Sequence, residues 1–112
     1  MIASVELDGQ KFLALNGGPH FKFTEAISFL VNCETQQEVD HFWGKLSAGG
    51  EEGRCGWLKD KFGVSWQIVP SVLPQLLQSG DREAPARVMQ AMLQMGKLDS
   101  ERLKQAHIGN NP

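Results

Sequence analysis

Histidine and cysteine are the side chains of this sequence best suited to metal binding or nucleophilic chemistry. The three histidines, His20, His41 and His107, lie far apart, and none stands four residues from another ligand as helical metal pairs do. The two cysteines, Cys33 and Cys55, have mostly apolar neighbours, and two thiols are too few for a four-thiolate zinc site. We therefore predict no metal site and two buried, unreactive thiols.

Motifs that bind a nucleotide or activate a serine are missing from the sequence. It contains no G-x-S-x-G elbow, no G-x-G-x-x-G fingerprint and no G-x-x-x-x-G-K-[ST] loop. The pair Gly17-Gly18 lacks the helix that must follow a phosphate-binding loop, so we predict no nucleotide, no S-adenosylmethionine and no other cofactor. Ser28 and Ser65 are expected to be ordinary strand serines.

Aromatic side chains are concentrated in the part of the chain that reads as strands. They are Phe12, Phe21, Phe23, Phe29, Trp57, Phe62 and Trp66. Packing in the core is the simplest interpretation. The alternative is an apolar pocket on a curved sheet, where a few amides would orient a small ligand. The candidates for such a pocket are Asn16, Phe29, Trp57, Trp66 and Gln67.

Strands predicted before residue 34 would position several of these side chains. Residues 2–7 alternate in polarity, and Asp8-Gly9 suits a two-residue type I′ turn, because aspartate and glycine tolerate positive φ. The return strand, 10–16, is apolar on both faces, as a central or doubly covered strand would be. A third strand is expected over about 26–33.

The clearest helix signal follows, where Thr35 and Glu38 form a capping box. Apolar residues then recur on one helical face. They are Val39, Phe42, Trp43 and Leu46. A glycine pair stops the helix at 49–50, and 51–53 reads as a solvated loop. Two strands and three helices complete the expected order, with Ser71 as the cap of the first helix and Asp99 or Ser100 as the cap of the last. The strands are expected at 54–58 and 64–69, and the helices at about 71–77, 83–95 and 99–106.

Composition limits the classes of partner. The 112 residues fit one domain, and the formal charge of −2 predicts neither nucleic-acid nor membrane binding. No apolar run is long enough to cross a bilayer, and the residues after Met1 do not read as a secretory signal, so we expect a cytoplasmic protein.

Several stretches carry a resemblance to a known family. Residues 60–68, Asp-Lys-Phe-Gly-Val-Ser-Trp-Gln-Ile, resemble the last hairpin of the vicinal oxygen chelate superfamily, which includes glyoxalase, bleomycin-resistance and extradiol dioxygenase proteins. Residues 4–19 and 55–70 are similar to its PhnB-like branch, labelled 3-demethylubiquinone-9 3-methyltransferase-like. The likeness runs from residue 3 to residue 109.

The resemblance implies an α+β fold of βαβββ modules, each a cupped mixed sheet, followed here by C-terminal helices. In one PhnB-like domain of residues 1–112, the segment 1–24 would end a truncated first module. Residues 25–70 would form a second βαββ module, and 71–109 the helices. Since modules from two chains commonly complete the cup in these families, we predict a homodimer.

The resemblance also implies metal ligands, which this sequence lacks at the corresponding positions. Metal-dependent members carry a histidine on the first strand of a module and a glutamate on the last. Here the strand predicted over 26–33 has no histidine, and Gln67 stands at the glutamate position. An amide is a poorer ligand than a carboxylate for a hard divalent cation, so we transfer no metal ligand. The methyltransferase label is taken as a family name and not as an activity.

Three interpretations of function are compatible with these residues. The first is a metal-free module that binds a small apolar or aromatic molecule in the cup. The alternative is a vicinal-oxygen-chelate-type enzyme, a lyase, dioxygenase or methyl-transfer-like protein, acting there through His20, Cys33, Cys55 or Glu6. The third is a dimer whose cup is filled by its own side chains.

Overall fold

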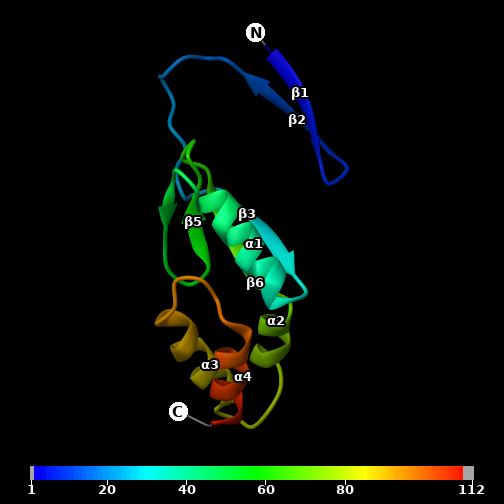
Figure 1. Ribbon diagram of the computed structural model, residues 1–112, viewed down its shortest axis with the longest axis vertical. Coiled ribbons are helices and arrows are strands. Elements are labelled where there is room, and N and C mark those ends of the chain that lie inside the picture. Colours follow the sequence, from blue (N-terminus) through cyan, green and yellow to red (C-terminus); the bar gives the residue numbers. More distant parts are fainter. Residues whose placement is uncertain (1, 110–112) are drawn as a thin grey trace.

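The computed structural model describes residues 2–109, and its strands form a two-stranded ribbon and a four-stranded sheet (Figure 1). The ribbon pairs β1 with β2 and the sheet has the order β3-β6-β5-β4. The strands are β1 (Ile2–Leu7), β2 (Gln10–Leu15), β3 (Ser28–Cys33), β4 (Glu51–Glu52), β5 (Trp57–Lys59) and β6 (Ser65–Pro70). The helices are α1 (Gln36–Ser47), α2 (Val72–Leu77), α3 (Ala84–Leu93) and α4 (Ser100–Ile108).

The ribbon forms as the sequence predicts, but its environment differs. Asp8 and Gly9 have φ of 49° and 78°, which fits the type I′ turn. The expectation that the second strand is covered on both faces is wrong, since β2 pairs only with β1 and is mostly exposed. Leu13 and Leu15 remain 68% and 71% exposed. The pattern of apolar residues along β2 shows which side chains could be buried, but it does not show whether another element packs on them.

The four-stranded sheet is mixed. β3 runs parallel to β6, whereas β5 is antiparallel to both β6 and β4. The loop predicted at 51–53 is wrong in part, because Glu51 and Glu52 pair with Lys59 and Leu58 to form β4. The strand expected at 54–58 begins only at Trp57, since the chain turns through positive φ at Cys55 and Gly56. The elements β3 to β6 thus form a complete βαβββ unit.

Helix α1 covers one face of this sheet. Thr35 caps it by accepting a hydrogen bond from the Glu38 backbone N–H at 3.1 Å, as the capping box predicts. The helix contributes Val39 and Trp43 to a core on the sheet. The sheet residues buried in that core are Cys33, Leu58 and Ile68. Burying these apolar side chains is the main force that holds α1 on the sheet.

Strand alternation places a second set of side chains on the face opposite α1. Side chains point to alternate faces along a strand, so the neighbours of the buried residues face away from the helix. In the observed register, Ser65 stands between Ser28 and Lys59, and Gln67 stands between Leu30 and Trp57. We call this surface the open face. Within residues 2–109, no helix covers this face around Ser65 and Gln67, although Val69 further along β6 packs against the core of the last three helices.

The last three helices form a second core at the end of the molecule away from the ribbon (Figure 1). Asp99 caps α4 as predicted, accepting from the Arg102 backbone N–H at 3.2 Å. Ser71 precedes α2 but makes no side-chain capping bond, so that expectation is wrong. The buried residues of this core are Leu73, Leu76, Val88, Met95, Leu98 and Leu103.

These parts are arranged along one axis, with extents of 54 × 26 × 23 Å. The radius of gyration is 16.6 Å, against about 13 Å for a compact domain of this length, because the ribbon extends from the sheet. Within residues 2–109, no helix combines the length and the apolar character needed to cross a bilayer.

Candidate functional site

The structure divides the five predicted pocket residues between separate surfaces. Phe29 and Trp66 lie on the face that α1 covers, with ring centroids 5.2 Å apart. Trp57 and Gln67 pair across β5 and β6 on the open face. Asn16 follows β2, beyond the ribbon's last strand residue. Phe29 and Trp66 therefore share a cavity of about 610 Å³ beside the ribbon, whereas Trp57 and Gln67 are neighbours on the open face.

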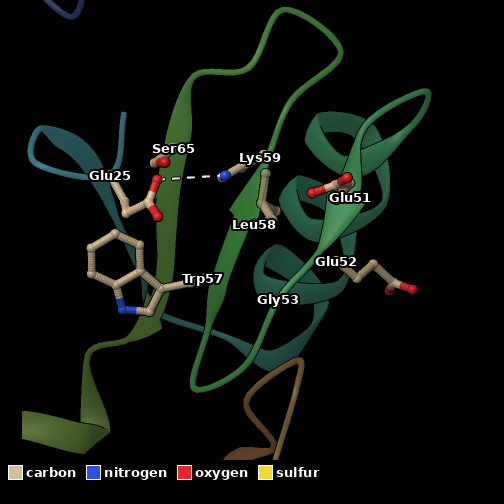
Figure 2. Close-up of a pocket in the computed structure, with 8 residues that line it drawn as sticks. All are labelled: Glu25, Glu51, Glu52, Gly53, Trp57, Leu58, Lys59 and Ser65. Carbon is tan, nitrogen blue, oxygen red and sulfur yellow. Dashed lines mark ion pairs between the residues drawn. The ribbon is translucent and has the colours of Figure 1, made fainter. Parts of the chain in front are cut away.

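The open face carries a cavity of about 200 Å³ between β4, β5, β6 and the segment that precedes β3. Its lining residues are Glu25, Glu51, Glu52, Gly53, Trp57, Leu58, Lys59 and Ser65. Figure 2 shows Glu25 facing Lys59 beside β6, with the Trp57 ring below them and the Glu52 carboxylate pointing away. The cavity thus combines an aromatic surface with charged and hydroxyl groups.

An ion pair stands across this cavity. Lys59 Nζ lies 3.5 Å from Glu25 Oε2, and both side chains are partly exposed. A backbone hydrogen bond and then the Lys59 ammonium hold the pKa of Glu25 below its usual 4.5, so the carboxylate is charged at neutral pH. The pair joins the irregular segment before β3 to the sheet.

Ser65 is the most constrained polar group on this face. The residue is only 2% exposed, and its Oγ has no hydrogen-bond partner among residues 2–109. The same residue also borders a second cavity of about 270 Å³, lined by the segment around Phe23 and Ile27. A buried hydroxyl without a partner costs free energy, so it calls for an explanation.

Sequence reasoning missed most of this site. Ser65 was expected to be an ordinary strand serine, whereas the structure leaves its hydroxyl unpaired. The signal available in the sequence was the alternation that puts Lys59 and Ser65 opposite the apolar face. Glu25 had no such signal, because it lies in irregular chain before β3.

The residues considered for catalysis are not gathered in this cavity. Cys33 is fully buried beneath α1, and burial raises the pKa of its thiol. Cys55 lies in the turn before β5, Glu6 in the ribbon, and His20 in the segment after it. None of the four lines the cavity that contains Trp57.

The residues present do not fit the metal site that the resemblance implies. β3 carries no histidine, and the Gln67 amide already donates a hydrogen bond from Nε2 to Ser28 Oγ at 2.9 Å. Among residues 2–109, no three histidine, cysteine, aspartate or glutamate side chains come together as a set that could hold a metal ion. We therefore derive no step through a metal.

Comparisons with known proteins agree with this architecture. The family model described as 3-demethylubiquinone-9 3-methyltransferase matches residues 1–69, which include the ribbon and nearly all of the βαβββ unit. A PhnB protein from Bacillus cereus, which carries the same methyltransferase name, is 35% identical with a TM-score of 0.58. The similarity covers 63% of this chain and 64% of that one, so this chain spans less than two thirds of the relative's length. No curated protein matches.

The fold and the comparisons together define an α+β protein built on a βαβββ unit. The chain belongs to the 3-demethylubiquinone-9 3-methyltransferase family, as a PhnB-like member.

Proposed function

We propose that this chain is a small-molecule-binding module, which holds an apolar or aromatic molecule on the open face of the sheet without a metal. The observation that carries the proposal is the position of Trp57, half-buried on the uncovered face and lining a cavity of about 200 Å³. Ligand sites typically combine such an apolar wall with a small number of fixed polar groups.

Fixed polar groups are present beside Trp57. Gln67 is held in place by its hydrogen bond to Ser28, and Ser65 is buried in the strand between β3 and β5. Groups held by neighbouring strands lose little freedom when a ligand binds, which favours affinity. The side chains named for the enzymatic alternative, His20, Cys33, Cys55 and Glu6, do not line this cavity.

The three tryptophans provide a direct test. The indole N–H of Trp43 donates to Glu52 Oε1 and that of Trp66 to Asp60 Oδ2, and both rings lie on the α1 side of the sheet. In an NMR titration with benzyl alcohol, we expect the Trp57 indole signal to move while the other two stay in place. Movement of Trp43 or Trp66 alone, or of none, would overturn the proposal.

We also propose that a second copy of this chain completes the cup. This proposal is supported by the apolar residues that the ribbon leaves exposed, including Ile2 at 67% and Leu13 at 68%. An isolated two-stranded ribbon is marginally stable in water, and exposed apolar patches of this kind mark interfaces. β3 adds an unpaired sheet edge that contains no charged residue and no proline.

The space between the ribbon and β3 also favours a symmetric partner. A cavity of about 610 Å³ lies there, and the Phe12 and Phe29 rings meet across it with centroids 5.9 Å apart. A twofold dimer would place the same ribbon and edge of each copy against the other.

Light scattering after size-exclusion chromatography tests the dimer. We expect a particle of about twice the 12.4 kDa chain mass. Leu13→Lys should weaken the association because it places a charge in the interface, whereas Ile108→Lys, at an equally exposed position on α4, should not. A wild-type chain that is monomeric at all concentrations tested would contradict the proposal.

A further inference from the structure

The cavity on the open face contains a hydroxyl that no residue of the described chain, 2–109, satisfies. Ser65 is 2% exposed and its Oγ makes no hydrogen bond, although a hydroxyl can donate one and accept two. On the neighbouring strand, Ser28 Oγ accepts a hydrogen bond from Gln67 Nε2 and makes none with Ser65 Oγ. A ligand group that reaches Ser65 would therefore gain a partner without displacing a protein hydrogen bond.

The charges around this hydroxyl favour a cation. The carboxylates of Glu25 and Glu51 line the cavity, and Lys59 is the cation that lines it with them. Lys59 is already paired with Glu25 at 3.5 Å. The third carboxylate, Glu52, accepts a hydrogen bond from Trp43 at 2.5 Å on the other face. An anionic ligand would meet an excess of negative charge, whereas an ammonium would meet complementary charge.

The aromatic wall points to the same class of ligand. Trp57 lies beside Glu25 in the cavity, and a tryptophan face attracts a cation held within about 6 Å of its centroid (Figure 2). The volume of about 200 Å³ is below the roughly 300–1,000 Å³ of sites for drug-sized molecules, so the ligand is small.

We propose that this cavity binds a small organic ammonium, whose N–H groups donate to Ser65 Oγ and to the Glu25 carboxylate while its carbon body lies against Trp57. The inference rests on the proposed function and specifies the chemical class of the ligand.

Calorimetric titration with three probes of similar size tests this inference. The probes are benzylamine, benzyl alcohol and benzoate, which share a ring and differ in the charge of the polar group. We expect benzylamine to bind about tenfold more tightly than benzyl alcohol, as one charge-assisted hydrogen bond allows, and benzoate to bind most weakly.

Two variants and one control variant test separately the contacts of the ammonium with Glu25 and with Ser65. Glu25→Gln should remove the preference for benzylamine and improve benzoate binding, because it frees Lys59. Ser65→Ala should weaken benzylamine several-fold without lowering thermal stability, since it deletes an unpaired hydroxyl. Glu34→Gln, at an exposed carboxylate beyond the far end of β3, should leave the affinity for all three probes unchanged.

The outcomes distinguish this inference from the proposed function. If all three probes bind at Trp57 equally well, or benzoate binds best, the ammonium inference fails and the binding module stands. If no probe perturbs Trp57, both fail. A benzylamine preference that survives in both Glu25→Gln and Ser65→Ala would also overturn the inference.

Discussion

The Gln67 amide donates a hydrogen bond from Nε2 to Ser28 Oγ at 2.9 Å, which connects β6 to the edge strand β3 on the open face. This amide stands where the resemblance implies a metal-binding glutamate. It therefore acts as a link within the sheet surface, and it holds a polar group at a fixed position next to Trp57.

Removing the hydrogen bond between Gln67 and Ser28 should lower the free energy of unfolding, whichever of the two side chains is replaced. Gln67→Ala and Ser28→Ala should each destabilise the fold by about 1 kcal/mol, the usual net worth of a hydrogen bond. In a double-mutant cycle measured by urea unfolding, the two effects should couple by a similar amount. Strictly additive losses would show that the two side chains do not interact in solution.

The core beneath α1 should be sensitive to truncation at β6. Ile68 is fully buried, so Ile68→Ala should lower the free energy of unfolding by about 2–5 kcal/mol through lost burial and the cavity left behind. Ile108 is 74% exposed, and Ile108→Ala should change the free energy of unfolding by less than about 0.5 kcal/mol. Equal effects in denaturant titrations would argue against the described packing.

The two thiols should differ in reactivity. Cys33 is fully buried, and burial raises the pKa of its thiol, so little thiolate is available to react. The expectation that Cys55 is also buried is wrong, because this residue is partly exposed in a turn. Iodoacetamide should therefore label Cys55 in the native protein and Cys33 only after unfolding, as read by peptide mass spectrometry. Rapid native labelling of Cys33 in a Cys55→Ser variant would refute this assignment.

Acid should loosen the contact between α3 and α4. The Arg87 guanidinium bonds both oxygens of Asp81 and the backbone carbonyls of Ala106 and His107, and the hydrogen bond from Arg87 holds the pKa of Asp81 below its usual 3.8. A depressed pKa gives stability that is present above pH 3.8 and is lost as the pH falls through the folded value.

The measurement compares wild type with Asp81→Asn in urea at pH 6 and at pH 3. At pH 6 the wild type should be the more stable protein, and the difference should shrink at pH 3, because below pH 3.8 the unfolded chain takes up a proton at Asp81 more readily than the folded chain does. A difference that is constant between the two pH values would exclude this contribution.

Much of the fold could be predicted because its signals are local. The cap at Thr35 and the turn at Asp8-Gly9 depend on residues within a few positions of each other. The hairpin before β6 is also local, since Asp60 accepts hydrogen bonds from the backbone of Phe62 and Val64 and from the Trp66 indole. Such contacts can be inferred from residue type and spacing alone.

The remainder depended on contacts that spacing does not encode. β4 consists of two glutamates, which favour strand weakly, and it forms because Leu58 and Lys59 lie beside it. The exposure of β2 follows from the absence of a covering element over the described residues, which its apolar pattern cannot reveal. Of the predicted pocket residues, only Trp57 lines the cavity, and Glu25 was missed because it reaches the cavity from irregular chain.

A crystal structure of the protein soaked with benzylamine tests the central claim most directly. We predict electron density for the ring against Trp57 on the face opposite α1, with the amine within hydrogen-bond distance of Ser65 Oγ. Density confined to the ribbon, or an open face filled by the side chains of a second copy, would contradict the claim that this face is a ligand site.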